Sequence, residues 1–160
     1  MKACYPGSFD PITSGHMDII KRSADIFDEV VILLMENPRK SVHFSAEERK
    51  EMIEDSIEEY GLENVTVVIG SGLTVEMARK TGAKVIIRGL RFPADYDYEL
   101  TQASANMVLA EEIETLFMNA RPALAFLSSS TVREIAMNGG DFRHMVPVAI
   151  YERVKGRFDQ

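Results

Sequence analysis

Apolar residues along this chain form two kinds of pattern, which alternate from one end to the other. Short continuous runs rich in Val, Ile and Leu are typical of strands buried on both faces; they lie at residues 3–5, 30–35, 65–69, 84–87 and 115–118. Longer stretches with apolar residues every three or four positions predict helices; they lie at residues 17–27, 45–60, 73–80, 94–112 and 131–137 and after Pro147. This alternation predicts a single doubly wound, Rossmann-like α/β domain over residues 1–160, with a five-stranded parallel sheet.

The segment between the first predicted strand and the first predicted helix, residues 5–16, has features of a phosphate site. Thr13 or Ser14 would cap the helix, and the unpaired N–H groups of a helix start favour phosphate oxygens. Gly7 and Gly15 would let the backbone approach those oxygens closely. The chain has no Walker motif and no complete Gly-x-Gly-x-x-Gly run, so a phosphate would be held without a Walker lysine. The alternative is that these residues simply form a turn.

Basic side chains lie where predicted strands end, which is the edge at which open α/β sheets bind ligands. Lys40 follows the second strand in the polar loop 36–40, and Arg88 and Arg91 come directly off the end of the fourth. Thr74, at a predicted helix start, could meet a ligand or only cap the helix. A solvated loop lysine is the alternative for Lys40. For the arginines it is surface pairing with Asp95, Asp97 or Glu99.

Three consecutive serines precede the predicted helix 131–137, and Arg133 lies one turn further on. A helix start needs one side-chain cap, so Ser128, Ser129 and Ser130 offer more hydroxyl groups than capping requires. We interpret them as a second group of phosphate ligands at a helix start.

Two of the predicted helices have surfaces of distinct character. The helix over 94–112 carries Tyr98, Ala105 and Leu109 on one side, a stripe typical of a core or of subunit contact. We therefore expect closed symmetric assembly through apolar helix faces. The helix over 45–60 begins with a Ser-x-x-Glu capping box, and we interpret its acidic residues as the solvated face of a covering helix.

Composition narrows the class of protein further. Of the 160 residues, 46% are hydrophobic and 27% charged, as in soluble globular domains, and no apolar run is long enough to span a bilayer. A net charge of -7 argues against a general nucleic-acid or membrane-surface binder. No signal-peptide pattern follows Lys2, and the lone Cys4 fits a core position, so we expect a cytoplasmic protein.

Two motifs in sequential order resemble the signatures of the nucleotidyltransferase superfamily, which is related to the class I aminoacyl-tRNA synthetases. The first is Gly-Ser-Phe-Asp-Pro followed by Thr-x-Gly-His, at residues 7–16; the second, at residues 128–133, is similar to Ile-Ser-Ser-Thr-x-x-Arg. Asn-Pro-x-Lys at 37–40, Arg-Gly-Leu-Arg at 88–91 and Asp-Tyr-x-Tyr-Glu at 95–99 extend the match over nearly the whole chain. Together they resemble the bacterial phosphopantetheine adenylyltransferase family.

The resemblance implies an adenylyl transfer from ATP to 4'-phosphopantetheine, giving dephospho-coenzyme A and pyrophosphate. It also implies magnesium as the ATP complex, a homohexamer, and coenzyme A as a feedback inhibitor. The chemistry agrees with the residues, because transfer between two phosphates needs positioning cations and donors rather than a protein nucleophile. The chain offers no nucleophile-elbow motif and no metal-ligand cluster in its sequence.

The resemblance assigns roles to individual residues. It implies His16, Lys40, Arg88 and Arg91 as the catalytic group, with His16 touching the reacting phosphate. The pantetheine substrate would meet Ser8, Lys40, Thr74 and Arg88. ATP would contact Ser8, Phe9, His16, Gly89, Leu90, Arg91, Glu99, Leu124, Ala125, Phe126, Leu127, Ser128, Ser129 and Ser130.

Two departures from the family pattern stand out. Ser14 replaces a frequent Asn, and Leu124-Ala125 replaces an aromatic-Ser pair, which changes the expected packing beside the adenine. Two rival functions stay open. One is another nucleotidyltransferase, such as a nicotinamide-mononucleotide adenylyltransferase or a cytidylyltransferase, against which Lys40 and the Arg-Gly-Leu-Arg segment argue. The other is a non-catalytic coenzyme A sensor, which would tolerate the loss of His16.

Overall fold

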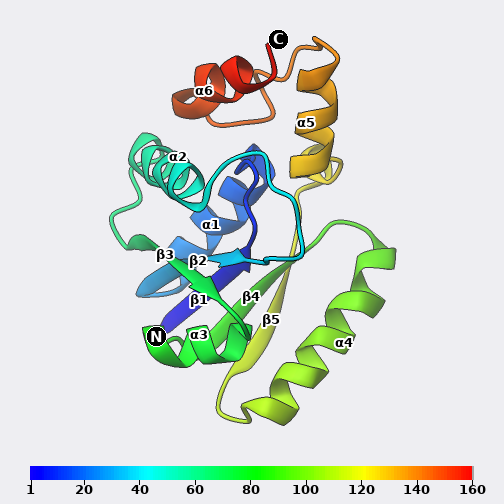
Figure 1. The fold of residues 1–160 in the computed structure, drawn as a ribbon. Coiled ribbons are helices and arrows are strands. Elements are labelled where there is room, and N and C mark those ends of the chain that lie inside the picture. Colours follow the sequence, from blue (N-terminus) through cyan, green and yellow to red (C-terminus); the bar gives the residue numbers. More distant parts are fainter. Residues whose placement is uncertain (160) are drawn as a thin grey trace.

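The computed structural model describes residues 1–159 and contains, in that range, one five-stranded sheet (Figure 1). Its strands are β1 (Lys2–Gly7), β2 (Glu29–Glu36), β3 (Val65–Ser71), β4 (Val85–Leu90) and β5 (Glu114–Asn119). They lie in the order β3-β2-β1-β4-β5, and each neighbouring pair is parallel. The predicted doubly wound α/β fold with a five-stranded parallel sheet is confirmed.

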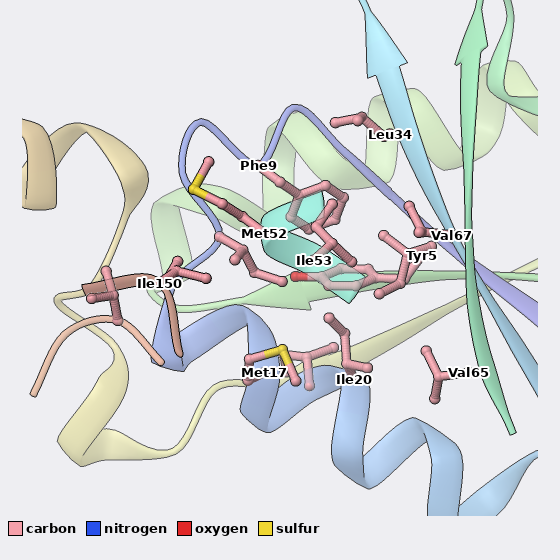
Figure 2. Close-up of a cluster of buried hydrophobic side chains, with 14 of the residues drawn as sticks. Tyr5, Phe9, Met17, Ile20, Leu34, Met52, Ile53, Val65, Val67 and Ile150 are labelled. Atoms are coloured by element: carbon pink, nitrogen blue, oxygen red, sulfur yellow. The ribbon is translucent and has the colours of Figure 1, made fainter. Parts of the chain in front are cut away.

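Helices cover both faces of the sheet (Figure 1). They are α1 (Ser14–Ile26), α2 (Ala46–Glu59), α3 (Thr74–Thr81), α4 (Pro93–Leu109), a short 3-10 helix η1 (Pro122–Leu124), α5 (Ser129–Met137) and α6 (Val148–Phe158). The larger core joins one sheet face to α1, α2, α5 and α6, and Figure 2 shows part of it, with side chains of the strands and helices converging on Tyr5. A smaller core on the other face contains Cys4 and residues of α3, so the cysteine is the small core residue that was expected.

Local capping signals were predicted correctly. Thr13 is the N-cap of α1, where its hydroxyl accepts a hydrogen bond from the His16 N–H at 3.2 Å. Ser45 and Glu48 form the capping box that opens α2, with each side chain accepting from the backbone N–H of the other. These contacts satisfy backbone donors that would otherwise be unpaired at the helix starts.

Several predicted boundaries were wrong by a few residues. β4 runs through Arg88 to Leu90, because Arg88 pairs with Phe117 and Leu90 with Asn119, so Arg88 belongs to the strand rather than following it. α5 begins at Ser129 instead of residue 131, because Ser128 is its N-cap. α4 ends at Leu109 rather than at residue 112, before a turn in which Ala110 is buried.

The stripe on α4 lies in solvent in the single chain. Tyr98 is 65% exposed and Leu109 51% exposed, and only Glu99 and Ala103 are buried among the helix residues 93–109. Figure 1 shows this helix along one edge of the fold. The stripe is therefore not part of the hydrophobic core of this chain, so that interpretation is wrong. Subunit contact, the other interpretation, stays a prediction.

Within residues 1–159, no helix is both long enough and apolar enough to cross a membrane.

Candidate active site

A cavity of about 960 Å³ opens at the carboxyl ends of the parallel strands. This position follows from the fold, because open α/β sheets leave a crevice where neighbouring strands send their helices to opposite faces. The predicted site residues that line it are Ser8, Phe9, His16, Lys40, Thr74, Arg88, Gly89, Arg91, Glu99, Leu124, Leu127 and Ser128. Five others named from the sequence lie beside this lining rather than in it: Leu90, Ala125, Phe126, Ser129 and Ser130.

The His16 ring is held in one orientation at the start of α1. Its Nδ1 accepts a hydrogen bond from the Thr13 backbone N–H at 3.1 Å and lies 3.1 Å from the Thr13 hydroxyl. Since Nδ1 is the acceptor, we assign the proton of the neutral ring to Nε2. Burial, helped by the positive charge of Arg91, lowers the pKa of His16 to about 4. The ring is therefore a neutral hydrogen-bond donor at pH 7.

The loop between β1 and α1 forms the floor of the cavity below His16. Phe9 packs edge-on to the His16 ring, with centroids 5.1 Å apart. The backbone of Phe9 has a positive φ of 47°, a conformation that costs energy for any residue other than glycine. Gly7 has no side chain where a Cβ would come within 2.9 Å of the Phe9 ring, so this close packing requires glycine.

Arg88 and Arg91 line the cavity while bound to carboxylates. Arg88 donates to both Glu99 oxygens, at 2.7 and 2.8 Å, and its Nη1 donates to the Pro6 carbonyl at 3.2 Å. Although burial opposes its charge, the hydrogen bonds and charge of Glu99 raise the pKa of Arg88. Arg91 pairs with Asp95, at 3.5 Å. Pairing with acids, set out above as the alternative to ligand binding, is thus compatible with a place in the site.

Lys40 and Thr74 lie on the rim of the cavity. Lys40 is exposed in the loop after β2, with its backbone N–H bonded to the Asn37 carbonyl at 3.0 Å. Thr74 is the first residue of α3, and the N-cap is Leu73, which makes no side-chain cap hydrogen bond. The interpretation of Thr74 as a helix cap is therefore wrong. Thr74 instead lines the cavity at the start of α3.

The three serines before α5 have different surroundings. Ser128 lines the cavity and caps the helix through the Thr131 N–H, at 3.1 Å. Ser129 donates its hydroxyl hydrogen to the Pro11 carbonyl at 2.7 Å, and the Ser130 hydroxyl accepts a long hydrogen bond from Arg133. Two of the three therefore have structural partners that the sequence motif did not indicate, and their contact with ATP stays a prediction.

Sequence reasoning missed other residues of the site. Tyr5 and Ile19 line the cavity from β1 and α1, and burial raises the pKa of Tyr5 to about 12, which keeps its hydroxyl protonated. Tyr5 lies two residues after Ala3, on the same face of the strand. This two-residue periodicity could have identified Tyr5 as a residue of that face. Asp10 lies outside the lining but holds the loop beneath it: it is buried and accepts hydrogen bonds from the His43 and Phe44 N–H groups, contacts for which no local signal existed.

A second cavity of about 310 Å³ adjoins the first. The two share lining from Pro6, Leu73, Thr74 and Arg88, among others. The smaller one extends between β5 and α4, where its remaining lining includes Tyr98, Gln102, Ala103, Asn106 and Thr115. Such an extension suits an elongated ligand that begins near Arg88 and Thr74 and runs beneath α4.

Over residues 1–159, no group of three or more His, Cys, Asp or Glu side chains is arranged to hold a metal ion.

Comparisons with known proteins agree with this geometry. Residues 4–135 match the family model described as cytidylyltransferase-like. The phosphopantetheine adenylyltransferase of Thermotoga neapolitana is 48% identical over 159 residues, covering 97% of this chain and 98% of that protein. The enzyme of that name from Finegoldia magna is 49% identical over 158 residues, covering 99% and 96%.

A solved structure has a similar fold. The bifunctional NMN adenylyltransferase/ADP ribose pyrophosphatase of Francisella tularensis superposes with a TM-score of 0.75 at 17% identity. The match covers 99% of this chain and 50% of that one. At this low identity the likeness concerns the fold alone.

Proposed function

The chain belongs to the phosphopantetheine adenylyltransferase family of cytidylyltransferase-like proteins, and from this membership we propose that it transfers the adenylyl group of ATP to 4'-phosphopantetheine. A phosphate oxygen of 4'-phosphopantetheine attacks the α-phosphorus of ATP and forms a new P–O bond. The bond between the α-phosphorus and the bridging oxygen breaks, and pyrophosphate leaves with the bonding electrons. The products are dephospho-coenzyme A and pyrophosphate, a step of coenzyme A biosynthesis.

The observation that carries the proposal is the neutral, oriented His16 beside two arginines in one cavity. With Nδ1 occupied by Thr13, the ring offers its Nε2–H to the cavity and has no free nitrogen with which to act as a base. Arg88 and Arg91 supply positive charge nearby. This set suits direct in-line transfer, in which the protein positions two phosphates and stabilises developing charge.

We place the two substrates at opposite sides of the larger cavity. ATP lies near the starts of α1 and α5, with its α-phosphate at His16 and its adenine against the apolar Leu124 and Leu127. The acceptor phosphate lies near Lys40 and Arg88. The pantetheine arm extends into the adjoining 310 Å³ cavity, since Arg88 lines both cavities. Coenzyme A has the same arm, so we propose that it competes for this space as a feedback inhibitor.

Magnesium enters as the ATP complex in this proposal, with oxygen ligands supplied by the phosphates. We also propose a cytoplasmic location, the compartment expected from the sequence.

One experiment tests the function directly. Pyrophosphate release from ATP is measured with a panel of acceptors: 4'-phosphopantetheine, nicotinamide mononucleotide and other phosphate monoesters, and with CTP in place of ATP. We expect release only with ATP and 4'-phosphopantetheine together. Preference for nicotinamide mononucleotide or for CTP would identify another nucleotidyltransferase, and tight coenzyme A binding without any turnover would identify a sensor.

Replacing Lys40 with alanine is expected to raise the KM for 4'-phosphopantetheine more than the KM for ATP. The side chain extends from an exposed loop on the acceptor side of the cavity, where an ammonium group would attract the acceptor phosphate before reaction. Steady-state kinetics with each substrate varied in turn measures both constants. Lys155 in α6, which lies outside both cavity linings, is replaced in the same way as the control. A larger change in the ATP constant would contradict the assignment.

Assembly through α4 is the second expectation that the structure makes specific. Exposed apolar side chains on this helix include Tyr98, Met107, Val108 and Leu109, and such a surface is rarely left in water. We propose a closed homohexamer that covers it. Sedimentation velocity at micromolar concentration should show the hexamer for the wild type and smaller species for Val108→Glu. A monomeric wild type would refute the assembly.

A further inference from the structure

Within residues 1–159, the guanidinium group of Arg49 is buried inside the fold without a carboxylate partner. Arg49 lies on α2 and is 2% exposed. Its Nε donates to the Phe44 carbonyl at 3.1 Å and to the Ser45 carbonyl at 3.3 Å, and its Nη1 donates to the Ser8 carbonyl at 2.7 Å. Across residues 1–159, every hydrogen-bond acceptor of this side chain is a backbone carbonyl. The sequence pattern assigns the acidic residues of this helix to solvent and makes no prediction for Arg49.

A buried charge of this kind is costly, because carbonyl oxygens replace its hydration without neutralising it. An apolar residue of similar volume would fill the same space under α2 at lower cost. The contacts of Arg49 indicate the role of this charge. Its hydrogen bond to the Ser8 carbonyl joins α2 to the β1–α1 loop, 41 residues earlier in the chain. That loop forms the floor of the cavity below His16.

The Ser8 contact fixes the orientation of the peptide unit between Ser8 and Phe9. In a trans peptide the carbonyl and the N–H point in opposite directions. Because the Ser8 carbonyl points towards Arg49, the Phe9 N–H points away from α2. Both residues line the cavity, and the part of the chain that the structure describes supplies no hydrogen-bond acceptor for that N–H. It is therefore a free donor on the floor of the site.

A second set of hydrogen bonds holds the β1–α1 loop, and here the loop is the acceptor. The Asp10 carboxylate accepts hydrogen bonds from the backbone N–H groups of His43 and Phe44, each at 3.0 Å. Phe44 thus donates to the loop through its N–H and accepts from Arg49 through its carbonyl. This reciprocal set of bonds ties the β1–α1 loop to the segment that follows Lys40. These hydrogen bonds also hold Phe9 at its positive φ, an unfavourable conformation that a free loop would leave.

We propose that Arg49 is a positioning residue for adenylyl transfer, which acts through the Ser8–Phe9 peptide by directing the Phe9 N–H at a phosphate oxygen of the nucleotide. The proposal rests on the proposed function. Arg49 does not touch the substrate; it sets the direction of a backbone donor that does. Loss of the side chain lets the peptide rotate, so a donor needed while charge builds on the phosphate is misplaced.

Two variants of Arg49 test the role. Arg49→Met keeps the apolar part of the side chain and removes all three hydrogen bonds. Arg49→Lys keeps the charge, and its single nitrogen cannot reach the carbonyls of Phe44 and Ser8 in the forked geometry of a guanidinium. We expect kcat to fall by about 10²-fold in Arg49→Met and by about tenfold in Arg49→Lys, with a much smaller change in the KM for ATP.

Val65→Ala serves as the control for a purely structural effect. Val65 is buried at the amino end of β3, at the opposite edge of the sheet from the cavity, so its truncation lowers stability without touching the loop. The Tm of each variant gives the folded fraction at the assay temperature. A kcat loss in the Arg49 variants that exceeds the loss in Val65→Ala at matched Tm supports positioning. If Arg49→Met does not fold, Arg49→Lys carries the comparison.

A direct readout comes from protein labelled with ¹⁵N at phenylalanine, with the Phe9 signal identified by its loss in Phe9→Leu. Addition of magnesium-ATP should shift the Phe9 amide in the wild type and leave it nearly unmoved in the Arg49 variants. Wild-type kcat in both variants, or an equal Phe9 shift in all proteins, overturns the proposal. A wild type that is itself inactive with ATP and 4'-phosphopantetheine overturns the proposed function instead.

Discussion

Replacing His16 with alanine is expected to lower turnover by ~10²–10³-fold, equivalent to about 2.7–4 kcal/mol, the usual effect of removing one preorganised donor to a developing oxyanion. Thr13 fixes the ring so that Nε2 carries the proton, and the edge-on packing of Phe9 restricts its rotation. In the proposed binding mode, this donor meets the α-phosphate without reorganisation. Charge on that phosphate grows in the transition state, which is where the hydrogen bond is strongest.

The affinity for ATP should fall much less than turnover in the same variant, because in the proposed binding mode Arg91 and the segment around Ser128 also hold the nucleotide in the ground state. Calorimetric ATP binding and steady-state turnover on one preparation measure both quantities. His144→Ala is the matched control, since His144 is exposed and lies outside the cavity lining. Near-normal turnover in folded His16→Ala would contradict the donor role, and a trapped adenylyl group on His16 would contradict direct transfer.

The pH dependence distinguishes a donor from a base. A general base would have its pKa near the working pH, whereas burial holds the pKa of His16 at about 4, below its ordinary value of 6.5. Between these two values the unfolded chain binds the proton and the folded chain does not. The stability that neutral His16 contributes is thus complete above pH 6.5 and is lost as the pH falls towards 4. Denaturation at several pH values should show this loss in the wild type and not in His16→Ala.

Replacing Arg88 with alanine is the second substitution with a large expected effect. We expect kcat/KM for 4'-phosphopantetheine to fall by on the order of 10²-fold, with a smaller fall for ATP, because the cation lost lies where the two cavities meet. The change also leaves Glu99, which is 9% exposed, without its bidentate partner. An unpaired carboxylate would then face the incoming phosphate and repel it.

Glu99→Gln separates these two causes. It removes the negative charge of Glu99 and leaves Arg88 in the cavity, so it should impair acceptor use less than Arg88→Ala does. Exposed Arg143, which pairs with Asp141 and lies outside both cavity linings, provides the control substitution. Initial rates with each substrate varied, together with the Tm of every variant, make the comparison. Equal loss of ATP and acceptor efficiency in Arg88→Ala would count against an acceptor clamp.

Much of the fold and part of the site were predictable from the sequence because their causes are local. Strand burial and helix amphipathicity repeat over two to four residues, so the alternation of elements is visible in the printed chain. Parallel strands place their carboxyl ends at one edge, which brings the residues after separate strands together without further information. The meeting of His16, Lys40, Arg88 and Arg91 at one cavity follows from that rule. The helix caps at Thr13 and Ser45 are equally local.

The long-range partners of the polar side chains were decided only by the tertiary structure. Arg49 reaches Ser8 across 41 residues of chain, Arg88 reaches Pro6 across 82, and Ser129 reaches Pro11 across 118. No periodicity specifies such contacts, because they depend on how helices from distant segments pack against the sheet. The apolar pattern of α2 identifies it as amphipathic, yet it does not predict that Arg49 is buried, since only the finished packing supplies the carbonyl oxygens that make this burial tolerable. The sequence by itself thus determined which groups gather at the strand ends, and the packing determined how each of them is held.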